Sequence, residues 1–257
     1  MENFLIKKEN DSIIYGSIYN LEKDSSIDVE NKVDYLNDLD VKNIMIACHG
    51  FESNRVGYTI KTLAQGLKDV VVIGFDWPGH NDSDEKLLIK NCMSSYEHVY
   101  EYTIRRFPKA RVFLFGSSFG GYMTLQFLKK HPECIAEKVF FKSPAIKMEK
   151  IFEMIASGED MSKYSETPYV TPKGVEVYYE FYKEMLDIKI TPENIVSKPE
   201  IYIFHGTDDK LSLYEDILEY NKDNIHVQAF EGVEHGFRGD YFQKMVDGIN
   251  KEINATS

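Results

Sequence analysis

The sequence contains no basic tract, although charged residues make up 28% of it. Its 257 residues include 30 lysines and arginines against 42 aspartates and glutamates, so the formal net charge is −12 at pH 7. Proteins that bind a phosphate backbone or an anionic membrane surface need clustered cations. The sequence therefore predicts neither nucleic acid nor a membrane as a partner, and it favours neutral over anionic substrates.

Paired cysteines, long apolar runs and internal repeats are missing as well. The three cysteines, Cys48, Cys92 and Cys134, contain no Cys-x-x-Cys pair, which fits neither a disulfide framework nor a zinc site. No apolar run approaches the roughly 18 residues that span a bilayer, and we find no secretory signal. We therefore expect a cytoplasmic protein with free thiols, a monomer or a homodimer, without a metal or a cofactor.

Hydrophobic residues make up 43% of the sequence, which is enough for a substantial core. Many fall in short continuous runs, typical of strands buried on both faces, and these runs alternate with helical periods. The patterns predict strands over residues 4–8, 12–19, 44–48, 70–75, 112–115, 138–141, 201–204 and 226–230. They predict helices over residues 60–67, 94–107, 122–130 and 242–253, the second opened by a capping box of Ser94 and Glu97.

Strands that alternate with helices predict an α/β fold, with a mostly parallel sheet of about eight strands and helices on both faces. Ligands of such sheets bind at the carboxyl ends of the strands. The alternation stops between residues 145 and 198, where two helical periods, over residues 148–155 and 175–186, flank the turn-rich residues 158–172. We predict that residues 145–198 form a small cap, inserted into a core of residues 1–144 and 199–257. The acidic residues 22–40 are predicted to be an exposed connection.

A candidate nucleophile follows the third buried strand, in the sequence Gly116-Ser117-Ser118-Phe119-Gly120. A serine on a sharp strand-to-helix turn has a strained backbone that lifts its hydroxyl clear of the sheet. The residues two before and two after it must be small, because the turn brings them together. This spacing selects Ser118 rather than Ser117. The alternative is a glycine-rich turn with an incidental serine.

A serine nucleophile needs a base and an acid that orients the base. His235 lies between the last predicted strand and the last helix, and a carboxylate just past strand 201–204 would lie one loop away. Asp208 and Asp209 both stand there, whereas we expect His205 to pack within that strand end.

The sequence His49-Gly50-Phe51 ends the first buried strand. A glycine at this point lets the backbone approach a ligand closely, and the amide of Phe51 would then face the site. The alternative is an ordinary turn with a buried aromatic side chain.

Taken in order, these motifs resemble those of the α/β-hydrolase superfamily. His49–Phe51 looks like its oxyanion loop, residues 116–120 like its nucleophile elbow, residues 205–209 like its H-G-x-x-D acid motif, and residues 233–237 like its histidine loop. Residues 75–83 resemble its D-x-x-G-H-G-x-S segment, with Asn81 in place of the second glycine; asparagine tolerates left-handed backbone angles. Within that segment, Asp76 and His80 are expected to be structural. The short loop and modest cap resemble small bacterial carboxylesterases, including the feruloyl and cinnamoyl type.

The resemblance implies a catalytic triad of nucleophile Ser118, base His235 and acid Asp209. Asp209 is the fifth position of the acid motif, and its neighbour Asp208 is the alternative. The backbone amides of Phe51 and Phe119 would form the oxyanion hole. Some members carry the acid after the preceding strand, but residues 142–144 offer no carboxylate here.

We therefore expect hydrolysis of a small-molecule carboxylic ester, with a small or medium acyl or aryl group, through an acyl-enzyme. A thioesterase or small-peptide hydrolase with the same triad is one alternative, and a non-catalytic binding module on the same fold is another. The predicted cap is rich in aromatic residues and methionine. We predict five substrate-binding residues, Phe51, Tyr164, Tyr169, Tyr178 and Tyr182, although aromatic stripes at helical spacing also occur as core.

Overall fold

The computed structural model describes residues 1–21, 41–155, 160–188, 190–191, 199–220 and 222–255. The predicted connection over residues 22–40 lies outside these ranges, as does part of the predicted turn-rich stretch. Among the described residues, no helix combines the length and the apolar character needed to cross a membrane.

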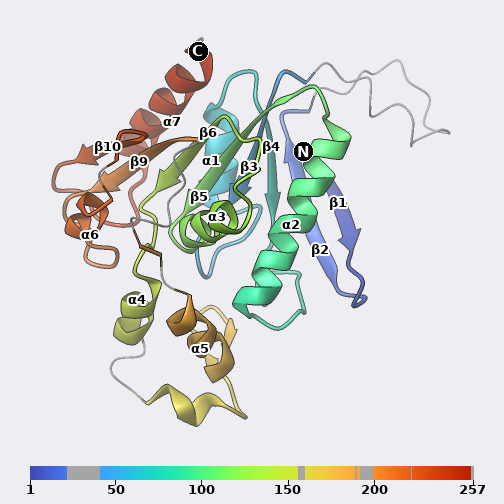
Figure 1. Cartoon of the computed structure of the whole chain (residues 1–257), viewed down its shortest axis with the longest axis vertical. Coiled ribbons are helices and arrows are strands. Elements are labelled where there is room, and N and C mark those ends of the chain that lie inside the picture. Colours follow the sequence, from blue (N-terminus) through green and yellow to red (C-terminus); the bar gives the residue numbers. More distant parts are fainter. Residues whose placement is uncertain (22–40, 156–159, 189, 192–198, 221, 256–257) are drawn as a thin grey trace.

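The centre of the molecule is an eight-stranded sheet of order β1-β2-β4-β3-β5-β6-β9-β10 (Figure 1). The two pairings of β2 are antiparallel and the other five pairings are parallel. The predicted strands are confirmed to within two residues at each end. Their bounds are β1 (Glu2–Lys7), β2 (Ile13–Tyr19), β3 (Asn43–Cys48), β4 (Val71–Phe75), β5 (Arg111–Ser117), β6 (Lys138–Lys142), β9 (Glu200–Gly206) and β10 (Ile225–Phe230).

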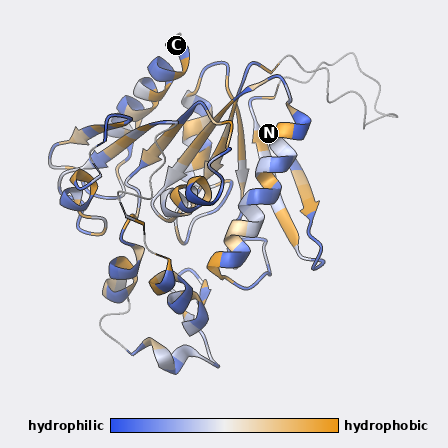
Figure 2. Ribbon diagram, viewed as in Figure 1, coloured by the Kyte–Doolittle hydropathy of each residue, from blue (hydrophilic) through white to orange (hydrophobic). Residues whose placement is uncertain are grey.

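Helices cover both faces of this sheet, which confirms the predicted α/β fold. One hydrophobic cluster joins a sheet face to α1 and α7, and a second joins the opposite face to α2 and α3. Alternate residues of β3 belong to different clusters, so the strand is buried on both sides, and Figure 2 shows apolar colour concentrated in the central strands. The helix bounds are α1 (Tyr58–Gly66), α2 (Ile89–Arg106), α3 (Phe119–Lys130), α6 (Tyr214–Leu218) and α7 (Gly239–Asn254).

The predicted capping box at the start of α2 is wrong. The helix begins at Ile89, and Ser94 lies inside it, where its carbonyl oxygen is 2.8 Å from Nδ1 of His98. Glu97 contacts Lys130, the last residue of α3, instead of the start of α2. The reason is tertiary: the buried face of α2 already starts at Ile89, so packing extends the helix beyond the local capping signal. The short helix α6 was not predicted at all.

The insertion between β6 and β9 contains α4 (Met148–Ile155), the 3₁₀ helix η2 (Met161–Tyr164), β7 (Tyr169–Val170), β8 (Glu176–Val177) and α5 (Tyr179–Asp187). Figure 1 shows α4 and α5 together at the lower end of the molecule, outside the sheet. The second predicted helical period, over 175–186, begins too early, because residues 176–177 pair with β7 in a small antiparallel hairpin.

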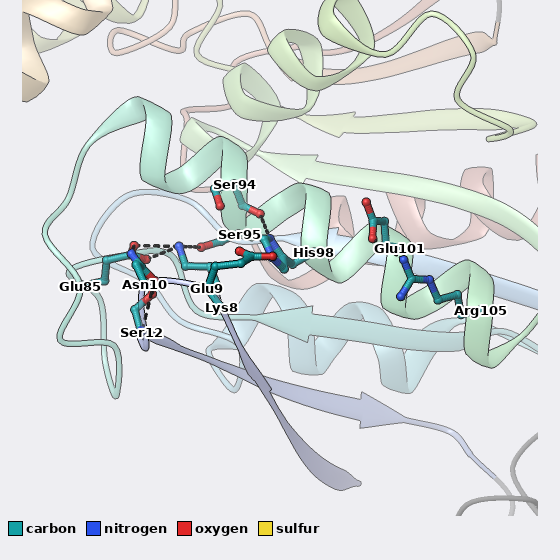
Figure 3. A network of polar contacts seen from close by, with 10 residues as sticks. All are labelled: Lys8, Glu9, Asn10, Ser12, Glu85, Ser94, Ser95, His98, Glu101 and Arg105. Atoms are coloured by element: carbon teal, nitrogen blue, oxygen red, sulfur yellow. Dashed lines mark hydrogen bonds and ion pairs between the residues drawn. The ribbon is translucent and has the colours of Figure 1, made fainter.

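The N-terminal hairpin is tied to the loop before α2 by a buried ion pair (Figure 3). The ammonium of Lys8 lies 2.6 and 2.7 Å from the carboxylate oxygens of Glu85 and 3.4 Å from the hydroxyl of Ser95. The side chains of Lys8 and Glu85 are 3% and 8% exposed, so neither charge is well screened by water. Removal of one partner would leave the other charge buried and uncompensated.

We expect Lys8→Met to lower the free energy of unfolding by about 3 kcal/mol, because Glu85 loses its cation in a buried site. Urea denaturation measures this change. Lys7→Met is the matched control, since Lys7 pairs with Asp11 on the surface, where both side chains are mostly exposed. Equal urea midpoints for Lys8→Met and the wild type would contradict the prediction.

Candidate active site

Ser118 occupies the sharp turn between β5 and α3. Its φ angle is +51°, a left-handed value that is uncommon for residues other than glycine. The turn is held by its backbone: the Ser118 N–H donates to the carbonyl of Lys142 at 3.0 Å, and the Ser118 carbonyl accepts from the N–H of Gly121 at 2.9 Å. These features match the strained elbow that the spacing predicts.

The two flanking glycines are required by close approach. A Cβ atom on Gly116 would lie 2.7 Å from the carbonyl oxygen of Gly120. A Cβ atom on Gly120 would lie 2.3 Å from the carbonyl oxygen of Cys48, at the end of β3. Both contacts are with backbone, which cannot move aside cheaply, so the elbow admits only glycine at these positions.

Three elements bring Ser118, His235 and Asp209 into one hydrogen-bonded chain. The Nε2 atom of His235 lies 2.9 Å from Oγ of Ser118, and its Nδ1 atom lies 2.7 Å from Oδ2 of Asp209. The serine follows β5, the aspartate follows β9, and the histidine lies in the loop between β10 and α7. The sequence places these residues far apart, and the strand order brings them together.

The Asp209 carboxylate is buried and held from several sides. Its Oδ1 atom accepts the backbone N–H groups of Leu211 at 3.0 Å and Ser212 at 2.9 Å. Burial favours the neutral acid, but hydrogen bonds from His205 and His235 outweigh it and hold the pKa of Asp209 well below its usual range. The group is therefore a carboxylate at neutral pH.

The geometry distinguishes the two aspartates that the sequence leaves open. Asp208 is exposed, and its Oδ1 atom lies 3.4 Å from the Thr207 hydroxyl, whereas Asp209 is 2% exposed and contacts His235. His205 is buried at the end of β9, as expected, but its Nε2 atom reaches the following loop, 2.8 Å from the carbonyl oxygen of Ser212 and 3.3 Å from Oδ2 of Asp209.

The loop after β3 lies against the elbow. A Cβ atom on Gly50 would lie 3.3 Å from Cβ of Ser118, and the ring of Phe51 meets the ring of Phe119 edge to face, with centroids 6.1 Å apart. Behind the loop, the His49 carbonyl accepts from the Trp77 indole at 2.9 Å. Burial lowers the pKa of His49 to about 3, so this imidazole is a neutral structural group.

Asp76 and His80 brace this loop from the segment after β4. Asp76 forms an ion pair with Arg55, accepts the Arg55 N–H at 2.8 Å and accepts the Asn81 amide at 2.8 Å. His80 Nε2 accepts the Glu52 N–H at 3.2 Å. Asn81 adopts the predicted left-handed angle, with φ +52°. These contacts agree with the structural roles expected for Asp76 and His80.

Four of the five predicted substrate-binding residues, Phe51, Tyr164, Tyr169 and Tyr182, pack against the same hydrophobic cluster. Phe51 lies beside the elbow, and its ring also meets that of Phe152 in α4, which in turn meets Tyr182 of α5. Tyr164 and Tyr169 pack against each other within the insertion. The structure thus connects Phe51 and Tyr182 through Phe152.

Tyr178 lines a different hollow. A cavity of about 560 Å³ lies between residues 79–87 and residues 173–178 of the insertion, and the ammonium of Lys86 lies over the Tyr178 ring. Of the described residues that line this cavity, none is Ser118, Asp209 or His235.

Phe152 and Phe181 belong to the aromatic residues of the predicted cap, but the sequence did not single them out as substrate-binding residues. Phe152 contacts Phe51, and Phe181 contacts Phe119, so the insertion packs over the carboxyl ends of β3 and β5. Both rings are almost fully buried. Their helical spacing was visible in the sequence, but spacing alone does not distinguish a pocket wall from a core.

The thiols and carboxylates of the described ranges form neither a metal site nor a reactive-thiol site. Within those ranges, no group of three or more His, Cys, Asp or Glu side chains is arranged to hold a metal ion. The three cysteines are free, and burial raises the pKa of Cys48 to about 12, so its thiol stays protonated.

An eight-stranded, mostly parallel sheet with a serine on a strand-to-helix elbow defines the α/β-hydrolase fold. The family model described as "Serine aminopeptidase, S33" matches residues 40–159, and no curated protein matches. Est1E from Butyrivibrio proteoclasticus, with ferulic acid bound, has a TM-score of 0.74 at 15% identity, over 98% of both chains. The esterase EaEST from Exiguobacterium antarcticum has a TM-score of 0.67 at 16% identity, over 99% of this chain and 100% of that one.

A third similar structure is the mouse α/β hydrolase domain-containing protein 10, with a TM-score of 0.72 at 15% identity over 100% of both chains. At these identities the likeness concerns the fold. The chain has the α/β-hydrolase fold and resembles bacterial esterases, and the family match supports a hydrolase.

Proposed function

We propose that this protein is a serine hydrolase that cleaves carboxylic esters through an acyl-enzyme. The observation that carries the proposal is the chain of contacts from Ser118 Oγ to His235 Nε2, at 2.9 Å, and from His235 Nδ1 to Asp209, at 2.7 Å. Nucleophile, base and orienting acid in hydrogen-bond contact are the arrangement that activates a serine hydroxyl.

In the proposed mechanism, Ser118 Oγ attacks the ester carbonyl carbon while its proton passes to Nε2 of His235. Asp209 accepts the Nδ1–H, which holds the required tautomer and stabilises the imidazolium. The backbone amides of Phe51 and Phe119 stabilise the oxyanion. His235 then gives its proton to the leaving alcohol. A water molecule repeats the sequence, releasing the acid and restoring the serine.

The substrate we propose is an ester with a small or medium acyl or aryl group. Support comes from the aromatic rings beside the elbow, in which Phe51 and Phe119 of the core meet Phe152 and Phe181 of the insertion. Residues 145–198 act as the cap in this proposal. Tyr182 extends the aromatic wall, and Tyr164, Tyr169 and Tyr178 remain proposed contacts on the cap side.

Hydrolysis of small peptides is the second candidate, because the family model matched by residues 40–159 is described as a serine aminopeptidase. The same triad would act on an amide, and a thioester would also be a substrate for it. A cytoplasmic location and a monomeric or homodimeric state complete the proposal.

The test is a panel of p-nitrophenyl esters of graded chain length, with matched p-nitroanilides and a fluorophosphonate probe. We expect one labelled site per chain, fastest turnover on short or medium esters, and anilide turnover at least roughly 100-fold slower. Absence of labelling contradicts the serine hydrolase proposal. Faster anilide turnover favours the peptidase, and a preference for long chains contradicts the proposed substrate size.

A further inference from the structure

Lys142 ends β6, the strand that lies between β5 and β9 in the sheet. Its backbone carbonyl accepts the N–H of Ser118 at 3.0 Å. Its side-chain ammonium donates to the backbone carbonyl of His235 at 3.1 Å, across 93 residues of sequence. One residue therefore contacts the backbone of both the serine and the histidine of the triad.

The Lys142 side chain is buried, which is energetically unfavourable for a cation. The residue is 5% exposed, and its ammonium lies 4.2 Å from the centre of the Phe237 ring. Removal of an ammonium from water is unfavourable unless other groups replace the lost solvation. Here the replacement consists of the His235 carbonyl, the ring face and the attraction of Asp209, while the charge of Arg238 opposes it.

The loop that carries His235 runs from the end of β10 at Phe230 to the start of α7 at Gly239. Val233 and Phe237 are buried, but the two residues that flank His235 are exposed. The carbonyl of Val233 accepts the N–H of Asp208 at 3.0 Å, which holds the loop two residues before the histidine. The ammonium of Lys142 holds the backbone at His235 itself.

We propose that Lys142 is a positioning residue, whose ammonium fixes the His235 backbone at the distance from Ser118 that proton transfer requires. The inference rests on the proposed function, because it assigns Lys142 a part in that reaction. Misplacement of a catalytic group by about 1 Å can cost roughly 100-fold in rate. Since Lys142 also binds the Ser118 N–H, it couples the positions of base and nucleophile.

Lys138, at the other end of β6, provides a matched control. Its ammonium also donates to a backbone carbonyl, that of Glu252, at 2.6 Å, and also lies over an aromatic ring, that of Tyr202, at 5.5 Å. The two lysines thus share two kinds of contact, to a backbone acceptor and to an aromatic ring, and Lys138 also lies 3.4 Å from the Glu252 carboxylate. Of the two, Lys142 alone makes them to the loop of the triad histidine.

The experiment compares Lys142→Met, Lys142→Arg and Lys138→Met with the wild type. Methionine keeps an unbranched apolar side chain and removes the ammonium. We expect Lys142→Met to lower kcat on a p-nitrophenyl ester by at least roughly 10-fold, with KM within about twofold, and to slow fluorophosphonate labelling. Lys142→Arg, which keeps the charge and the donors, should recover most of kcat. Lys138→Met should leave kcat within about twofold of the wild type.

Two results would overturn the inference: a kcat for Lys142→Met equal to that of the wild type, or an equal loss in Lys138→Met. Failure of the wild type to label would instead contradict the proposed function itself. If Lys142→Met does not fold, the inference is tested by the pH dependence of kcat in the wild type and in Lys142→Arg.

The expected pH profile follows from the charges around Lys142. Burial lowers the pKa of Lys142 to about 8; Asp209 raises it and Arg238 lowers it further. The wild-type kcat should therefore fall as the pH rises through about 8, as the ammonium loses its proton. In Lys142→Arg the fall should move to a higher pH, because guanidinium stays protonated. The same alkaline fall in both proteins, or in neither, contradicts the inference.

Discussion

Ser118→Ala is expected to lower kcat for ester hydrolysis by about 10⁶-fold, the scale of loss when a triad serine is removed. The hydroxyl oxygen that would form the acyl-enzyme is gone, whereas His235 and Asp209 remain. The fold should persist, because alanine meets the same backbone constraint at φ +51° as serine does. Turnover of a p-nitrophenyl ester measures the loss, and thermal unfolding checks the fold.

Ser117→Ala is the matched control for this experiment. Ser117 is the adjacent residue and is buried, but it is the last residue of β5, in register with Lys142 of β6. Its replacement should leave fluorophosphonate labelling at the wild-type level. If Ser117→Ala abolished labelling while Ser118→Ala did not, the assignment of the nucleophile would be wrong.

Asp209→Asn is expected to lower kcat by about 10⁴-fold. The asparagine oxygen can still accept the N–H groups of Leu211 and Ser212, which orients the amide NH₂ towards Nδ1 of His235. Two donors would then face each other, unless the imidazole adopts the tautomer that cannot accept the serine proton. The loss should therefore lie in kcat, and steady-state kinetics at saturating ester measures it.

Asp208→Asn is the control, because it replaces a carboxylate by an amide at the neighbouring position. Asp208 is exposed and its carboxylate contacts the Thr207 hydroxyl, so kcat should stay within about twofold of the wild type. A large loss in Asp208→Asn with a small one in Asp209→Asn would reverse the assignment of the acid.

The strands were predictable from sequence because a strand that is buried on both faces needs a continuous run of apolar residues. A strand such as β3 must be apolar at successive positions, and a short continuous run such as Ile44–Cys48 is typical of such a strand. The elbow was predictable for a similar reason. Gly116 and Gly120 each lie two positions from Ser118, so the elbow appears in the sequence as a local spacing, although the close approach of Gly120 to Cys48 is tertiary.

Helix ends were less predictable, since local signals compete there with packing. Ser94 and Glu97 have the residue types and spacing of a capping box, yet α2 begins at Ile89. The burial of Ile89 and Cys92 against the core stabilises the longer helix. A cap at Ser94 would stabilise the helix start by less free energy than the burial of the preceding turn against the core does.

The sequence by itself determined the order of strands and helices, the elbow at Ser118 and the candidates for base and acid, because each depends on residues close together in the chain. Only the tertiary structure decided which aspartate meets His235 and which lysine holds its backbone. Those contacts, from Asp209 and Lys142, depend on the lateral order β5-β6-β9-β10, which brings distant chain segments to one edge of the sheet. Local periodicity does not predict that lateral order, because the order depends on how the whole sheet packs.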